Sequence, residues 1–185
     1  SGEQVSAVIT YKADENNNVS FGREIFYDND AHEKIVSGEI SSLAKSRYVM
    51  LEFPVDIDYE TIAEAIRDIS MDGYIPIVSH VETYSCLDED EDMVEDLIKL
   101  GAYIQVDSGS VMGENGHDIR NFARKLVKNE MVHFIATDAH DCDDKAPLMK
   151  ECAEYIERKC GFDYMNEVLY INPMAIIEND DVEII

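Results

Sequence analysis

The chain has 185 residues, of which 40 are acidic and 15 are lysine or arginine, giving a formal net charge of −25. This length fits one domain, and no apolar stretch approaches the roughly 20 residues of a membrane-spanning helix. The negative charge argues against binding to nucleic acid, and against a phosphorylated substrate unless bound cations line the site. The four cysteines form no C-x-x-C pair and no secretory signal is visible, which indicates reduced thiols and a cytoplasmic location.

The first 18 residues differ from the rest of the chain. A short apolar stretch, Val5 to Ile9, is expected to form a strand ordered against the sheet. The polar residues Asp14 to Asn18 then indicate a hairpin tip or a disordered loop. Val19 to Phe21 predicts a short strand leading into Gly22-Arg23-Glu24.

From residue 48 onward, an apolar strand followed by a helical segment recurs four times at intervals of roughly thirty residues, as expected of β-α units. The predicted strands are Tyr48 to Phe53, Ile75 to Ser79, Tyr103 to Asp107 and Val132 to Ala136. Such parallel strands with helices outside predict an α/β barrel or an open doubly wound sheet.

Apolar residues at helical spacing follow each of these strands. The groups are Ile62, Ile66 and Ile69; Met93, Leu97 and Leu100; Ile119, Phe122, Ala123 and Leu126; Leu148, Cys152 and Ile156. Gly73 and Gly101 are placed as helix C-caps, and Pro147 as a helix start. A last helix is expected after Phe162, followed by a short turn from Pro173 to Ile177.

A D-x-H pair, Asp138 and His140, comes directly after the apolar run that ends at Ala136. Alternate residues of an extended segment project the same way, so the carboxylate and the imidazole can converge on one point. These are ligand types that Mn, Fe and Zn ions accept. For an isolated D-x-H, a solvated turn with an aspartate helix cap is the favoured interpretation.

Three more ionisable residues with metal-ligand chemistry are expected at the carboxyl ends of strands: Glu24, Glu52 and His80. Glu52 stands in an apolar strand, so it needs a partner, either a metal or one of the arginines Arg23 and Arg47. His80 alone also fits a hydrogen-bonded core histidine. The joint occurrence of these groups at corresponding strand ends favours a metal site. Among the other histidines, His133 is assigned to packing, and His32 and His117 to exposed segments without a role.

At these residues the chain resembles a family, the metal-dependent tyrosine phosphatases of Gram-positive capsular and exopolysaccharide operons, in the polymerase and histidinol phosphatase (PHP) superfamily. The resemblance runs from about Phe21 to Ile177. Its motifs are Gly22-Arg23-Glu24, L-E-F-P at Leu51 to Pro54, G-Y-I-P-I-V-x-H at Gly73 to His80, Gln105 to Ser110 with Gly113, and V-H-F-I-A-[ST]-D-A-H at Val132 to His140.

The resemblance implies a distorted (β/α)7 barrel of the PHP type with up to three divalent ions, most often Mn²⁺, that hydrolyses phosphotyrosine on a bacterial tyrosine kinase. Glu24 then corresponds to the bridging carboxylate, and Glu52 and His80 to ligands of one metal site. Asp138 and His140 correspond to ligands of the others and, with the basic residue Lys145, to the catalytic group. Residues 1–185 are expected to form a single domain, with 1–18 divergent and 19–180 family-like.

Two features depart from the family pattern. The family begins with an H-x-H strand, and no H-x-H occurs in this chain. We therefore expect a barrel that is incomplete at its N-terminus and that holds fewer metal ions. We also expect a homo-oligomer, formed at the open edge of the sheet. The family's H-P-E-R-Y appears as His80-Val81-Glu82-Thr83-Tyr84, without the arginine that grips phosphate. Alternative interpretations are a non-catalytic PHP-fold binding or assembly module, and a phosphatase for a small phosphate ester.

Overall fold

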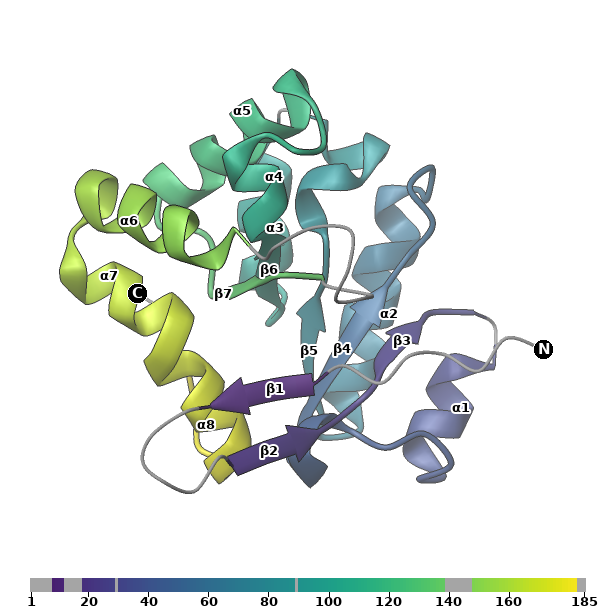
Figure 1. The fold of residues 1–185 in the computed structure, drawn as a ribbon. Coiled ribbons are helices and arrows are strands. Elements are labelled where there is room, and N and C mark those ends of the chain that lie inside the picture. Colours follow the sequence, from purple (N-terminus) through teal and green to yellow (C-terminus); the bar gives the residue numbers. More distant parts are fainter. Residues whose placement is uncertain (1–7, 12–17, 29, 89, 139–147, 183–185) are drawn as a thin grey trace.

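A five-stranded parallel sheet organises the fold (Figure 1). The computed structural model describes residues 8–11, 18–28, 30–88, 90–138 and 148–182. The strands lie side by side in chain order: β3 (Glu24–Phe26), β4 (Tyr48–Glu52), β5 (Ile75–Val78), β6 (Tyr103–Asp107) and β7 (Phe134–Ala136). Each connection therefore places the next strand on the same side of the one before it, as in an α/β barrel. In a doubly wound sheet the strand order reverses partway along the chain. The structure thus decides between the two architectures that the sequence pattern left open.

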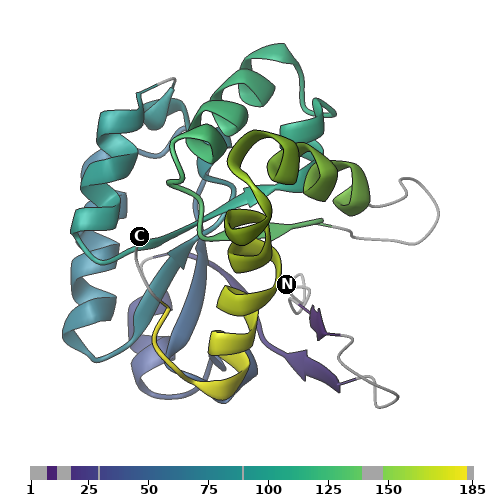
Figure 2. The same ribbon diagram turned by 90° about the vertical axis from the view of Figure 1, so that its left-hand side faces the viewer.

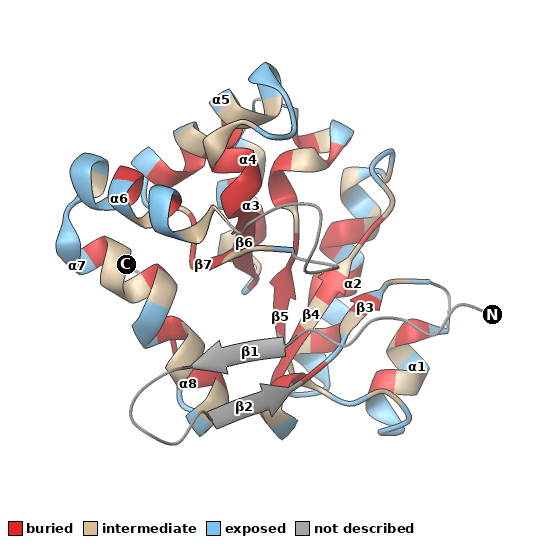
Figure 3. Cartoon of the chain, viewed as in Figure 1, coloured by how far each residue is buried: buried red, intermediate tan, exposed pale blue. Residues whose placement is uncertain are grey.

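Helices cover the outer face of this sheet (Figure 2). They are α1 (Ala31–Val36), α2 (Tyr59–Met71), α3 (Glu91–Lys99), α5 (His117–Lys128) and α6 (Met149–Cys160). Because strand residues alternate between faces, Val49 and Ile104 pack with these helices, while Tyr48 and Tyr103 point to the opposite, inner face. Figure 3 shows the buried residues concentrated on the strands and on the helices around them.

The inner face is covered near the start of the strands by α8 (Asn172–Glu178) and by the short turn η1 (Leu43–Lys45). The remaining short elements are η2 (Val81–Thr83), η3 (Ser85–Leu87), α4 (Ser108–Met112), α7 (Phe162–Asn166) and η4 (Glu167–Ile171). None of the helices in the described ranges is both long and apolar enough to cross a membrane.

The segment after α8 is fastened to the amino-terminal end of the sheet. The Tyr48 hydroxyl donates to the carbonyl of Asp180 at 2.8 Å and accepts from the Val182 amide at 3.0 Å. The Tyr103 hydroxyl donates to the Val182 carbonyl at 2.7 Å, and Arg47 Nη2 donates to Asp181 Oδ1 at 2.8 Å. Arg47 is therefore engaged at the end of β4 opposite to Glu52, and it is not the partner of that carboxylate.

The predicted strands from residue 48 onward are confirmed, each within two residues of its observed bounds, and so are the four helices that follow them. The glycine C-caps are confirmed as well. Gly73 has φ +84°, and the amide of Tyr74 closes the helix end on the carbonyl of Ile69. Pro147 lies outside the described residues.

The predicted turn from Pro173 to Ile177 is wrong, because these residues belong to α8. Pro173 is the second residue of α8, which follows η4 directly in the chain. Ala175 and Ile176 are buried against the inner face of the sheet, and this burial stabilises the helix.

At the N-terminus, β1 (Val8–Tyr11) and β2 (Asn18–Phe21) form an antiparallel pair of their own. The strand prediction is confirmed for residues 8 and 9, and residues 5–7 and 14–17 lie outside the described part. The expectation that this strand joins the main sheet is wrong: among the described strands, β1 pairs with β2 alone. Gly22 follows β2 and passes so close to Leu43 that a Cβ atom there would lie 2.5 Å from its Cδ2 atom.

Candidate metal centre

His80 follows β5 in a strained backbone conformation. Its φ of 52° and ψ of 34° lie in the left-handed region, which is unfavourable for a residue with a side chain. Hydrogen bonds hold it there: its amide donates to Gln105 Oε1 at 2.9 Å, and its carbonyl accepts from the Thr83 hydroxyl at 2.7 Å. The histidine is therefore fixed at the carboxyl end of the sheet, where α/β barrels place their active sites.

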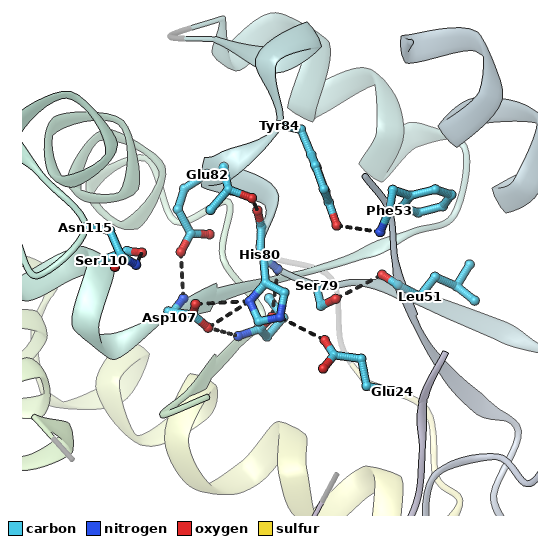
Figure 4. A network of polar contacts seen from close by, with 12 residues as sticks. Glu24, Leu51, Phe53, Ser79, His80, Glu82, Tyr84, Asp107, Ser110 and Asn115 are labelled. Carbon is cyan, nitrogen blue, oxygen red and sulfur yellow. Dashed lines mark hydrogen bonds and ion pairs between the residues drawn. The ribbon is translucent and has the colours of Figure 1, made fainter. Parts of the chain in front are cut away.

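The imidazole of His80 lies between two carboxylates (Figure 4). Its Nε2 atom is 2.9 Å from Glu24 Oε1, and its Nδ1 atom is 3.0 Å from Asp107 Oδ2. Burial by itself lowers the pKa of the ring, but the hydrogen bonds that the ring donates to Asp107 and Glu24 outweigh it and raise the pKa of His80 to about 11. A cation that binds Nε2 must therefore displace a proton from it.

Asp138 completes a set of three possible ligands. It follows β7 by two residues and also has a left-handed backbone, with φ 48°. One ligand atom from each of Glu24, His80 and Asp138 lies within 4.8 Å of the other two. Two ligand atoms bound to one ion at right angles and at about 2.1 Å each lie about 3 Å apart, close to the spacing of His80 Nε2 and Glu24 Oε1. The donor set of two carboxylates and one imidazole thus fits an ion such as Mn²⁺, Fe²⁺ or Zn²⁺.

A buried polar network supports these residues from β6 and η2. Gln105 donates from Nε2 to Asp107 Oδ1 at 2.9 Å, and the Asp107 amide donates to Glu82 Oε1 at 3.0 Å. Glu82 is 4% exposed, and this burial raises the pKa of its carboxyl, with the nearby charge of Asp107 raising it further. Gln105, Asp107 and Glu82 are therefore held by one another beneath the candidate ligands.

Comparison with known proteins identifies the family. The family model described as "Capsular polysaccharide synthesis, CpsB/CapC" matches residues 3–178. The chain belongs to the CpsB/CapC family. It is 34% identical over 164 residues to the tyrosine-protein phosphatase CpsB of Streptococcus pneumoniae, a match that covers 86% of this chain and 68% of that protein. It is 28% identical over 140 residues to the tyrosine-protein phosphatase YwqE of Bacillus subtilis, covering 76% of this chain and 55% of YwqE.

The fold is similar to a solved structure from a study of YwqE and CpsB, described there as unique metal-dependent tyrosine phosphatases. The TM-score is 0.81 at 25% identity, over 88% of this chain and 65% of that one. The predicted PHP-type α/β fold is thereby confirmed. The chain spans about two thirds of the length of the solved CpsB/CapC relative.

Of the metal ligands expected for a CpsB/CapC protein, Glu24, His80 and Asp138 lie together, while His140 falls outside the described residues, as does the expected catalytic residue Lys145. The expected position of Glu24 at the carboxyl end of a strand is wrong. It opens β3 beside Met50, and Gly22 and Arg23 separate it from the end of β2.

Glu52 ends β4 and is not one of the three clustered ligands among the described residues. It is nevertheless close to the site. Burial raises the pKa of the Tyr84 phenol, and the charges of Glu52 and Glu24 raise it further. Glu52 is two residues after Met50, the strand partner of Glu24, so its side chain projects from the same face of β4 as that of Met50.

The assignments of the other histidines are mostly confirmed. His133 is buried and packs edge-on against Tyr103, and His117 is exposed. His32 is partly exposed and pairs with Asp72 at 2.6 Å.

Sequence reasoning assigned no role to Asp107, Gln105 or Glu82. The rule that selected His80 would have found Asp107, since it is an ionisable residue at the carboxyl end of a predicted strand. Gln105 and Glu82 carry no comparable signal, because their roles depend on contacts across 25 residues of sequence.

Proposed function

We propose that this chain is a metal-dependent phosphoesterase of the CpsB/CapC type, acting on phosphotyrosine in a protein substrate. The observation that carries this proposal is the Glu24–His80–Asp138 cluster, which brings the first residue of β3 together with two residues that follow the carboxyl ends of β5 and β7. The relatives from Streptococcus pneumoniae and Bacillus subtilis are named tyrosine-protein phosphatases, which supports the substrate class.

In this proposal, Glu24, His80 and Asp138 hold the divalent ion, and Mn²⁺ is the ion expected. When bound, the ion supplies Lewis-acid chemistry: it activates water and offsets phosphate charge. That neutralisation matters because the net charge of −25 repels a phosphotyrosyl peptide. Glu24 and Asp138 supply the negative charge for the ion, and His80 supplies Nε2 after releasing its proton.

The test combines metal content with activity. The chain is loaded with Mn²⁺, dialysed and assayed by elemental analysis and by release of phosphate from a phosphotyrosyl peptide. We expect fewer than three tightly held ions and slow, Mn²⁺-dependent hydrolysis. Asp138→Ala should lower the rate about 10²-fold or more. Asp118→Ala is the matched control, because it removes the same charge from a side chain that is 88% exposed.

A second candidate function is a non-catalytic binding or assembly module. Thr83 favours it, because this hydroxyl is committed to the His80 carbonyl and supplies no cation for phosphate. Absence of both bound Mn²⁺ and hydrolysis in the test would support this module and contradict the enzyme. Faster turnover of a small ester such as histidinol phosphate than of the peptide would support a phosphatase for small esters instead.

A tyrosine kinase of capsule or exopolysaccharide synthesis is the protein substrate proposed. We also propose that the chain forms a homo-oligomer, because β3 and β7 are unpaired edges of the sheet within the described residues. Light scattering at moderate salt tests the assembly, and a monomer at all concentrations would contradict it. The cytoplasmic location stays a prediction.

A further inference from the structure

Asp107 has a position that the proposed metal ligands alone do not explain. It ends β6, is buried, and directs both carboxylate oxygens at one atom, His80 Nδ1, at 3.1 Å for Oδ1 and 3.0 Å for Oδ2 (Figure 4). Nδ1 is the ring nitrogen that points away from Glu24, since Nε2 is the atom 2.9 Å from that carboxylate. Asp107 therefore contacts the back of the ring, opposite the candidate metal position.

Asp107 is itself held in place from two sides. Its Oδ1 atom accepts from Gln105 Nε2, and its amide donates to the buried Glu82. Gln105 and Asp107 are two residues apart on one strand, so their side chains project from the same face. Because Gln105 also accepts from the His80 amide, β6 holds both the backbone and the ring of this histidine.

The chemistry of a carboxylate determines what this contact does. An ionised carboxylate only accepts hydrogen bonds, so Nδ1 must carry a hydrogen. Nε2, which faces Glu24, is then the nitrogen that can bind a metal, in exchange for its own proton. His133 illustrates the opposite arrangement in the same protein. Its Nδ1 atom accepts from the Ile104 amide at 3.1 Å, so any single hydrogen on that ring is on Nε2.

We propose that Asp107 is the positioning residue of the metal centre: it locks the His80 ring with Nδ1–H turned inward and Nε2 presented to a divalent cation beside Glu24. This inference rests on the proposed metal site and deepens it. A carboxylate behind a metal-binding histidine fixes the orientation of the ring, and loss of such a partner typically lowers metal affinity 10–100-fold.

The first test measures affinity for Mn²⁺ and Zn²⁺ by competition with a chromophoric chelator. Asp107→Ala should weaken binding about 10–100-fold. Asp107→Asn should weaken it less, because one oxygen at the Oδ1 position lies within reach of both His80 Nδ1 and Gln105 Nε2. Asp118→Ala, the exposed control, should bind as the unmodified chain does. Unchanged metal affinity in Asp107→Ala would overturn the proposal. Metal affinity as low in Asp107→Asn as in Asp107→Ala would also overturn it, because the effect would then come from the charge of Asp107.

The second test is a nuclear magnetic resonance measurement on histidine-ring ¹⁵N-labelled protein, with diamagnetic Zn²⁺ as the added ion. His80 should show an Nδ1–H proton protected from exchange, both without metal and with Zn²⁺, and Asp107→Ala should lose this protection while the His133 signals stay unchanged. An unprotected Nδ1–H in the unmodified chain would overturn the inference even if the Ala variant fails to fold. If the chain binds no metal, the proposed function fails, and the metal-free spectrum still decides the role of Asp107.

Discussion

Two of the three clustered ligand candidates, His80 and Asp138, share an unusual backbone conformation. Six described residues other than glycine have positive φ, and these two are among them. Such conformations cost of order 1–3 kcal/mol each and persist where surrounding contacts enforce them. For His80 those contacts come from Gln105 and Thr83, so the site is built into a strained strand end.

Thr83 provides a test at the scale of one residue. Thr83→Arg should raise kcat/KM for a phosphotyrosyl peptide about tenfold or more in the metal-loaded chain, because a guanidinium can grip phosphate with two hydrogen bonds. It should also cost about 1 kcal/mol of stability, since the bond to the His80 carbonyl is lost. The measurement is steady-state kinetics beside urea unfolding. Thr83→Val, which loses the same hydroxyl without gaining charge, should not raise the rate, and an unchanged rate in the arginine variant would show that phosphate binds elsewhere.

At the scale of elements, His133 connects β7 to β6 and to α8. Its amide donates to the Ile104 carbonyl at 2.9 Å, its Nδ1 atom accepts from the Ile104 amide, and its carbonyl accepts from Asn172 at 2.9 Å. Burial lowers the pKa of His133 from 6.5 to about 4. The strand junction that precedes Asp138 therefore depends on a neutral imidazole.

This shift predicts how stability depends on pH. Between pH 6.5 and about 4 the unfolded chain binds a proton at residue 133 that the folded chain does not, so stability falls as pH falls, by up to about 3 kcal/mol. His133→Asn keeps an acceptor near the Nδ1 position and cannot titrate. Urea unfolding at pH 7 and pH 4.5 should show a larger loss in the unmodified chain than in the variant. An equal loss of stability in the two proteins would mean that His133 is already protonated in the folded protein at pH 4.5.

At the scale of the whole molecule, charge is strongly unbalanced. With 40 acidic residues against 15 lysines and arginines, most carboxylates lack a basic partner. The ion pairs between Arg67 and Glu60 and between Lys99 and Glu95 are largely exposed, and such pairs contribute little. The folded chain is therefore destabilised by repulsion among its own carboxylates.

Screening should relieve this repulsion. Raising NaCl from 10 to 300 mM in the presence of a chelator should raise Tm by several degrees, since a gain of about 1 kcal/mol corresponds to about 3 °C for a chain of this size. KCl should act equally, because the effect is one of ionic strength. A Tm that stays constant or falls with added salt in calorimetry would show that repulsion among the carboxylates contributes little to the stability of the folded chain.

Local patterns in the sequence by themselves determined the strands from Tyr48 onward, the helices between them and the placement of His80 and Asp138 after strand ends. Hydrophobic periodicity and glycine caps depend on neighbours within a few residues, so no long-range information is required. The tertiary structure decided the rest. The barrel-type strand order, the helix at Pro173 and the separate β1–β2 pair depend on which surfaces meet. His80 contacts Glu24, Gln105 and Asp107, which are 25 to 56 positions away in the sequence. These contacts depend on how the strands of the whole sheet pack, and a periodicity among neighbouring residues carries no information about that packing.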